Sequence, residues 1–280
     1  MAQTKKTKKR TPIQAVLPIA LVLVVVIVLA LILGGNKKST VEAAAIQNGL
    51  DFLTQQENKN PEPVRKARQA LYERRMQEKK DQMIAELSSG TADPFALFQD
   101  YALLGDSRGV GFYFWDFLPE ERVLAEAGNT ILAIEDRHEA LKELKPSYVF
   151  LCYGLNDCSI GIWETGEEYA ADYMEEVRKL KELLPGVTIV VSSILPAQDP
   201  AFEQSTAWYD IPEWNLALKS ACEEEGVLFS DCDWLHEEHS DLWEVDGIHF
   251  MAPLYPYWGS ELIVTALYGG MTNETETLEH

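Results

Sequence analysis

The sequence predicts a three-layer α/β domain with a central parallel sheet, preceded by one transmembrane helix and a helical stalk. In the C-terminal two thirds of the chain, short apolar runs alternate with longer segments of helical periodicity, which is typical of repeated strand–helix–strand units. One long apolar run lies near the N-terminus, and a polar, proline-punctuated stretch separates it from the alternating region.

The N-terminal apolar run covers residues 15–33, and its 19 residues approach the roughly 20 that a helix needs to cross the hydrocarbon core. A cleaved signal peptide is the alternative, but its apolar run is roughly 7 to 15 residues long and has small residues close behind it. Here Ala43 and Ala45 form such a pair, and Lys37 and Lys38 intervene. We therefore expect an uncleaved transmembrane helix over residues 13–34.

The basic residues around this run predict its orientation. Five precede the run and two follow it: Lys5, Lys6, Lys8, Lys9 and Arg10, then Lys37 and Lys38. Positive charge is retained on the cytoplasmic side of a membrane helix. We expect residues 1–12 to form a cytoplasmic tail and the domain to lie outside the cell membrane as part of a single-pass protein.

A linker and a stalk are expected over residues 35–92. Residues 39–61 are polar and end at Pro61, which is typical of a linker before a helix start. From Val64 to Leu87 the apolar positions fall loosely on one helical face, and basic residues occupy the others. We favour packing of this face on the domain; contact with anionic lipid or a coiled-coil partner is the alternative.

The domain itself is expected over residues 93–272, and residues 273–280 form a tail that resembles the start of a vector-derived tag. The third apolar run is rich in β-branched residues, as in strands that a parallel sheet buries on both faces. The pattern predicts strands at 95–104, 147–153, 187–194 and 227–230, helices at 120–127, 135–144, 167–184 and 212–225, and a final helix from about Tyr257.

Charge is divided unevenly along the chain. Residues 1–38 hold seven basic residues and no acidic one, whereas residues 81–280 hold nine basic and 39 acidic residues, a formal charge of about −30. Affinity for nucleic acids comes largely from Lys and Arg that neutralise phosphates. The acidic region therefore excludes DNA or RNA as the partner.

Polar residues follow directly after the apolar runs. In an open parallel sheet the carboxyl ends of the strands share one edge, and catalytic groups collect there. The first run ends in Gly105-Asp106-Ser107, and the second ends in Gly154-Leu155-Asn156-Asp157. Gly128 lies between them, and Asp246-Gly247-Ile248-His249 lies before the final helix. These four places are predicted to form one site.

The residue types fit nucleophilic catalysis. A serine hydroxyl needs a base to take its proton, a third group to orient the base, and donors for the developing oxyanion. Ser107 is the candidate nucleophile, His249 the base and Asp246 the orienting carboxylate. The backbone N–H groups of Ser107 and Gly128 and the side-chain amide of Asn156 are the candidate oxyanion hole.

Each residue also has a structural interpretation. Ser107 fits a helix N-cap, Gly128 a helix terminator and Asn156 a turn residue. The order of the four places and their positions at strand ends favour the catalytic interpretation. The G-x-S-x-G pattern at residues 105–109 also matches the nucleophile elbow of α/β-hydrolases, but that fold needs several strands before the elbow, and here Ser107 follows the first.

In these blocks the sequence resembles the SGNH, or GDSL, hydrolase family. The matching segments are Leu104-Gly105-Asp106-Ser107, Gly128, Gly154-Leu155-Asn156-Asp157 and Asp246-Gly247-Ile248-His249, within residues 97–270. The resemblance implies a flavodoxin-like sandwich, catalytic Ser107, His249 and Asp246, an oxyanion hole of Ser107, Gly128 and Asn156, and no cofactor. It also implies a structural role for Asn215. The stretch after His249, Met251-Ala252-Pro253-Leu254, departs from the family pattern.

Other candidate sites are weaker. His236 and His239 have an H-x-x-H spacing that matches neither common zinc-protease motif, so we favour a solvated acidic turn over a metal site. The aromatic run at residues 112–115 fits either a sugar-stacking surface or the core. Of the four cysteines, only Cys222 and Cys232 are candidates for a disulfide.

Three functions follow from these residues. The leading hypothesis is a membrane-anchored, extracytoplasmic serine esterase that removes short acyl groups, O-acetyl above all, from a cell-surface glycan. An O-acyltransferase of a cell-surface polysaccharide would use the same three residues. A catalytically silent adaptor in wall assembly is the third.

Overall fold

The computed structural model describes residues 22–27, 39–57 and 60–269. Residues 22–27 are helical, and the rest of the predicted transmembrane segment at 13–34 lies outside the described residues, as do the cytoplasmic tail and residues 273–280. Among the helices that the structure describes, none is both long enough and apolar enough to cross a membrane. The chain divides into two compact units, one up to Ala67 and one from Arg68 onward.

The region before the domain is more helical than the sequence predicts. Helix α2 (Ser39–Glu57) occupies most of the expected linker at 39–61, for which the sequence analysis predicted no helix. Its alanine, glutamine and glutamate residues have high helix propensity, which outweighs their polarity. Helix α3 (Glu62–Ser88) confirms the helix predicted from Val64 to Leu87, and none of its side chains is buried.

A five-stranded sheet forms the centre of the second unit, and every strand runs parallel to its neighbours. Its order is β2-β1-β3-β4-β5, the flavodoxin-like arrangement of a doubly wound sheet. The strands are β1 (Tyr101–Gly105), β2 (Val123–Ala125), β3 (Tyr148–Cys152), β4 (Thr188–Ser192) and β5 (Leu228–Ser230). The predicted α/β fold with a central parallel sheet is therefore confirmed.

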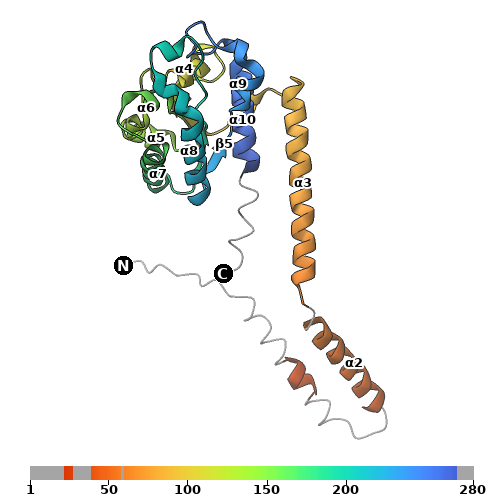
Figure 1. Ribbon diagram of the computed structural model, residues 1–280. Helices are drawn as coiled ribbons and strands as arrows, with labels where there is room; N and C mark the ends of the chain where they lie inside the picture. Colours follow the sequence, from red (N-terminus) through yellow and green to blue (C-terminus); the bar gives the residue numbers. More distant parts are fainter. Residues whose placement is uncertain (1–21, 28–38, 58–59, 270–280) are drawn as a thin grey trace, which may run out of the picture. The chain divides into compact units, whose positions relative to one another are not determined.

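Consecutive strand residues point to opposite faces and build two separate apolar layers. Leu104, Leu151 and Val191 belong to one core cluster, which includes Tyr173 and Leu180 of α7 and Leu218 of α8. Leu103, Phe150 and Val190 belong to the other cluster, with Phe112 of α4 and Trp258 and Leu262 of α10. The helices on the two faces appear in Figure 1; they are α4 (Ser107–Phe114), α5 (His138–Leu144), α6 (Leu155–Ile160), α7 (Gly166–Leu183), α8 (Ile211–Glu224), α9 (Trp234–His239) and α10 (Tyr255–Tyr268).

Three of the predicted elements were wrong in type or extent. The expected strand at 95–104 begins only at Tyr101, because Asp93 caps a 3-10 turn at Pro94–Leu97 by accepting from the N–H of Phe95. The expected helix at 120–127 is a 3-10 turn followed by the edge strand β2, which is too short to show a period. The expected helix at 135–144 is divided, because residues Ile131–Arg137 form a 3-10 segment and α5 begins only at His138.

The cysteine prediction is also corrected. Cys152, Cys158, Cys222 and Cys232 are all buried and unpaired, so the candidate bridge between Cys222 and Cys232 is not formed. Cys222 packs in the core between α8 and the sheet, while Cys232 lies in the opposite core layer. The Cys232 thiol lies within hydrogen-bonding distance of the hydroxyls of Ser192 and Ser230.

Asn215 has the predicted structural role. Its side chain accepts from the N–H of Ile194 and donates to the carbonyl of the same residue, at 2.8 and 3.0 Å, and a further bond reaches Asp233. The buried N–H and C=O of Ile194, just after β4, thereby have hydrogen-bond partners although this residue belongs to no helix or strand. This fixes where the chain leaves the sheet towards the predicted site.

Candidate active site

Ser107 lies at the junction of β1 and α4. The strand ends at Gly105, and the buried Asp106 caps the helix because its carboxylate accepts from the N–H of Arg108 at 2.9 Å. Burial raises the pKa of the Asp106 carboxyl, although Arg108 opposes the effect. The Ser107 side chain opens the helix at the carboxyl edge of the sheet and is only half-buried.

The three residues predicted for catalysis lie in one hydrogen-bonded chain. His249 Nε2 is 3.0 Å from Ser107 Oγ, and His249 Nδ1 is 2.7 Å from Asp246 Oδ2. The His249 and Asp246 side chains remain 45% and 38% exposed. One imidazole nitrogen is therefore hydrogen-bonded to a carboxylate and the other to a hydroxyl, and solvent reaches both the imidazole and the carboxylate.

The loop that carries Asp246 and His249 is fixed locally. Asp246 Oδ1 accepts from the N–H groups of Ile248 and His249 at 2.8 and 2.9 Å, so one carboxylate organises both the turn and the imidazole. Gly247 has φ +70°, and a Cβ there would come within 2.2 Å of the Gln198 carbonyl oxygen. Only glycine fits this position.

These bonds set the charge of the carboxylate. Burial alone raises the pKa of Asp246, but hydrogen bonds from the His249 ring and from the N–H groups of His249 and Ile248 outweigh it, and the pKa falls below its ordinary value. Asp246 is thus ionised at neutral pH and favours a proton on His249 Nδ1. Nε2 is then free to accept from Ser107.

The predicted oxyanion residues Ser107, Gly128 and Asn156 follow the carboxyl ends of the neighbouring strands β1, β2 and β3. Gly128 is exposed with φ +82°, in the turn after β2. Asn156, in the first turn of α6, donates from Nδ2 to the Asn129 carbonyl at 2.9 Å. In the part of the chain that the structure describes, no acceptor is assigned to the backbone N–H of Ser107 or of Gly128.

A buried acid supports this side of the site. Asp157 Oδ1 accepts from the N–H of Ile131 at 2.9 Å, so the first turn of α6 holds the turn at residues 128–131 through both Asn156 and Asp157. Burial raises the pKa of Asp157 to about 7, although the N–H of Ile131 lowers it. Gly154, before this turn, has φ +133° and leaves no room for a Cβ against Ile194.

Arg108 is a residue that the sequence analysis missed. Its guanidinium is buried and donates to three backbone carbonyls: Ile248 at 2.8 Å, Pro196 at 3.2 Å, and Leu195. It also lies 4.8 Å from the centre of the Phe250 ring. One side chain therefore connects the helix of Ser107 with the loop of His249 and with the segment after β4. In the sequence it shows only as a basic residue beside the serine.

The remaining candidates lie elsewhere or in the core. The His236 ring packs edge-on to Trp243, and the His239 ring stacks on Tyr257 with 4.0 Å between centroids. Phe112 is fully buried, whereas Phe114 is exposed, so the aromatic run divides between core and surface. Met251 begins the short turn that leads through Ala252–Leu254 into α10.

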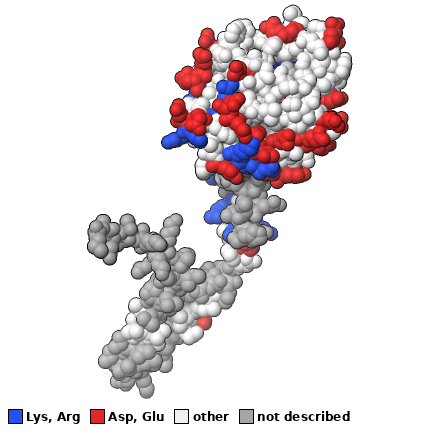
Figure 2. All heavy atoms as spheres, turned by 90° about the vertical axis from the view of Figure 1, so that its left-hand side faces the viewer, with Lys and Arg blue, Asp and Glu red and all other residues white. Residues whose placement is uncertain are grey.

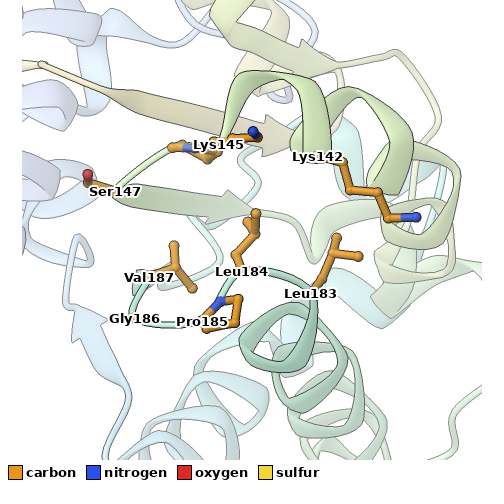
Figure 3. A pocket seen from close by; sticks show the side chains of 9 residues that line it. Lys142, Lys145, Ser147, Leu183, Leu184, Pro185, Gly186 and Val187 are labelled. Carbon is orange, nitrogen blue, oxygen red and sulfur yellow. The ribbon is translucent and has the colours of Figure 1, made fainter. Parts of the chain in front are cut away.

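A surface hollow of about 520 Å³ lies at the opposite end of the sheet (Figure 3). Ser147 and Val187 line it just before β3 and β4, together with Lys142 and Lys145. The amino ends of strands face away from the edge where Ser107 and Asn156 lie. This hollow is therefore separate from the predicted site.

Comparison with known families agrees with the geometry. A family model described as the GDSL-like lipase/acylhydrolase family matches residues 89–255, which include Ser107, Gly128, Asn156, Asp246 and His249. The chain belongs to this family. It is therefore a serine ester hydrolase of the GDSL type. No curated protein matches the sequence.

Several solved structures resemble this GDSL hydrolase at low sequence identity. A GDSL-like lipase from Bacteroides thetaiotaomicron has a TM-score of 0.49 at 16% identity, covering 67% of this chain and 96% of its own. A lipase/acylhydrolase from Enterococcus faecalis has a TM-score of 0.48 at 16% identity, covering 61% and 96%. An acetylxylan esterase from Geobacillus stearothermophilus has a TM-score of 0.41 at 17% identity, covering 61% and 93%.

The position of Arg108 generates a prediction for this GDSL hydrolase. Arg108→Met removes the donors that hold the His249 loop against α4, and a misplacement of about 1 Å can cost roughly 100-fold in rate. We expect kcat for p-nitrophenyl acetate to fall by about that factor with little change in KM. Arg108→Lys restores part of the loss, because an ammonium reaches some of the same carbonyls.

Arg122→Met is the matched control. Arg122 also donates to a backbone carbonyl, that of Tyr101, but at the other end of β1. Its kcat should equal that of the unmodified chain. Near-UV circular dichroism on every variant separates misplacement from unfolding. A folded Arg108→Met chain with normal kcat would show that the guanidinium does not position His249.

Proposed function

We propose that this chain is a membrane-anchored, extracytoplasmic esterase that removes short acyl groups, O-acetyl above all, from a cell-surface glycan. The observation that supports the chemistry is the continuous chain from Asp246 through His249 to Ser107, at 2.7 and 3.0 Å. Geometry of this kind makes a serine hydroxyl a nucleophile, because its proton has an oriented acceptor.

In the first half of the reaction, Ser107 Oγ attacks the ester carbonyl carbon and its proton passes to His249 Nε2. The negative charge on the carbonyl oxygen is stabilised by the backbone N–H groups of Ser107 and Gly128 and by the Asn156 amide. The C–O bond to the alcohol then breaks, and His249 gives its proton to the leaving oxygen. The acyl group remains on Ser107 as an ester.

In the second half, His249 takes a proton from a water molecule, whose oxygen attacks the acyl-serine carbonyl. The bond to Ser107 Oγ breaks, Oγ recovers the proton from His249, and the carboxylic acid leaves. Ionised Asp246 stabilises the imidazolium that forms in both halves. If a sugar hydroxyl replaced water, the same steps would produce acyl transfer.

Surface charge supports a neutral substrate. Asp and Glu side chains are spread over the displayed face of the domain and outnumber Lys and Arg there (Figure 2), in line with the formal charge of about −30 for residues 81–280. Such a field disfavours anionic lipid headgroups and densely anionic polymers, although salt screens it beyond about 8 Å. A neutral acylated glycan meets no such repulsion.

Short acyl groups fit the expected distance from the membrane. The α3 helix has 27 residues, a length of about 40 Å at 1.5 Å per residue. A spacer of that length between the proposed anchor and the domain would carry the site into the zone of wall polymers, away from the bilayer. A site for lipid acyl chains would instead need an exposed apolar entrance at the membrane.

The proposed roles predict the effects of three substitutions. Ser107→Ala and His249→Ala should each reduce hydrolysis of p-nitrophenyl acetate to near background, because the three residues act as a unit. Asn156→Ala should reduce kcat by roughly 100-fold to 1000-fold, the range for one lost oxyanion donor. Ser260→Ala on α10, whose hydroxyl donates to the Pro256 carbonyl of its own helix, is the control and should keep full activity. Unchanged turnover in Ser107→Ala would refute the assignment.

The preference for short acyl groups is tested with a series of p-nitrophenyl esters from acetyl to decanoyl. We expect kcat/KM to be highest for acetyl and lower for octanoyl and longer chains, since the proposed substrate presents a small acyl group on a polar polymer. The measurement is initial rate below the critical micelle concentration of each ester. A steady rise in kcat/KM from acetyl to decanoyl would indicate a lipase-like groove and contradict the proposal.

The proposed topology rests on the five basic residues before the apolar run and the two after it. Protease added to intact spheroplasts should digest the domain, because it lies outside the membrane. Lysed spheroplasts serve as the control for protease sensitivity. Complete protection in intact spheroplasts alone would place the domain inside and exclude a cell-surface substrate.

A further inference from the structure

The segment between β4 and α8, residues 195–210, borders the candidate site on two sides. Trp208 Nε1 donates to the carbonyl of Leu155, the residue before Asn156, at 2.8 Å. The N–H of Gln198 donates to the carbonyl of Gly247, the residue after Asp246, also at 2.8 Å. The segment is therefore bound both to the oxyanion side and to the loop of His249.

This segment carries an aromatic pair that faces solvent. The rings of Phe202 and Tyr209 stack with 3.9 Å between centroids and 12° between planes. Phe202 is partly buried, while Tyr209 is 60% exposed. Two 3-10 turns, at Ala201–Glu203 and Thr206–Asp210, hold the two rings, and the fully buried Ala201 anchors the first.

The stack restricts the rotamers of Tyr209 before a ligand binds. An exposed tyrosine without a neighbour changes rotamer freely and loses that freedom on binding, which weakens the complex. Here Phe202 supports one face of the Tyr209 ring, and Trp208, the adjacent residue, is buried and hydrogen-bonded. A rigid aromatic surface of this kind supplies contact area at low entropic cost.

The chemistry of the surface selects the ligand. The face of an aromatic ring carries partial negative charge and attracts the polarised C–H bonds of a pyranose face. Asp199, Glu203 and Asp210 are exposed in the same segment, and their carboxylates accept hydrogen bonds from sugar hydroxyls. A nucleotide base would also stack, but these acids repel its phosphates. Anionic sugars are disfavoured for the same reason.

We propose that Tyr209, supported by Phe202, is a binding platform for a neutral sugar ring of the glycan whose acyl group is cleaved at Ser107. This inference rests on the proposed function and adds a subsite to it. The segment that carries this ring is bonded through Trp208 to Leu155, the neighbour of Asn156, which is the basis for assigning the stacked ring and the cleaved ester to one glycan. Tyr209 is a specificity-determining residue and takes no part in the chemical steps.

Binding is measured with the full chain carrying Ser107→Ala, which prevents turnover. The probes are O-acetylated neutral tetrasaccharides of glucose, xylose and N-acetylglucosamine, titrated by calorimetry. For a probe that binds, adding Tyr209→Ala should weaken Kd by about tenfold, the order expected for one lost stacking contact. Adding Tyr209→Phe should leave Kd within about twofold, because the ring face is kept.

Leu216→Ala is the matched control, since Leu216 on α8 is 71% exposed and forms no stack. In the active chain we compare kcat/KM for the same tetrasaccharide with kcat/KM for vinyl acetate, an ester without a ring. Tyr209→Ala should lower the ratio of the two about tenfold through KM, whereas Leu216→Ala should not change it. Rescue by Tyr209→Phe distinguishes stacking from a general structural effect.

The outcomes separate this inference from the proposed function. Equal effects of Tyr209→Ala and Leu216→Ala, or no binding of any tetrasaccharide, overturn the platform while Ser107-dependent cleavage of vinyl acetate continues. If the unmodified chain does not cleave these esters at all, the proposed function is overturned instead. Weakened binding of the tetrasaccharide in Tyr209→Ala alone supports the platform, and Ser107-dependent cleavage of the same tetrasaccharide by the active chain supports the proposed function.

Discussion

The chemistry of this protein depends on holding a loop from the C-terminal part of the chain against a helix that begins more than a hundred residues earlier. Arg108 provides that connection: its buried guanidinium, one residue from Ser107, donates to the carbonyl of Ile248, one residue from His249. Burial lowers the pKa of this arginine to about 10, so it keeps its charge at neutral pH. A buried cation that lost its carbonyl partners would be strongly destabilising, which makes the closed arrangement the stable one.

Two carboxylates of the candidate site, Asp246 beside His249 and Asp157 beside Asn156, differ in their surroundings. Asp246 is half-exposed, accepts three hydrogen bonds and has a lowered pKa, which suits a residue that must stay ionised while His249 gains a proton. Asp157 is fully buried, and its pKa is raised to about 7. Its ionised form is less stable in the folded protein than in the unfolded one, so it lowers stability as pH rises from about 4 through 7. The fold tolerates this because Asp157 fixes the turn that presents Gly128.

The sequence predicted the parallel sheet and the long helices α7 and α8, because each depends on a local pattern, a β-branched run or a helical period. Short motifs at strand ends pointed to the five proposed site residues, and three of these, Asp246, His249 and Ser107, lie in one hydrogen-bonded chain. The sequence failed at β2, where three residues gain strand conformation only by pairing with β1. It also failed at Arg108, whose partners lie about 90 and 140 residues away. Tyr209 was missed for the same reason, since Phe202 lies seven residues away in a non-helical segment and no period connects the two rings. The two cysteines proposed as a pair differ in the face of the sheet they occupy, which the sequence alone does not show.

The central claim is that Ser107 is a nucleophile activated by His249, and covalent trapping tests it most directly. The full chain is treated with diethyl p-nitrophenyl phosphate, which phosphorylates activated serines, and the product is digested and mapped by mass spectrometry. The account predicts one diethylphosphoryl group per chain, located on Ser107, with labelling that is absent in Ser107→Ala and slowed by orders of magnitude in His249→Ala. An unlabelled chain that still hydrolyses p-nitrophenyl acetate, or a label on another serine that abolishes this activity, would contradict the account.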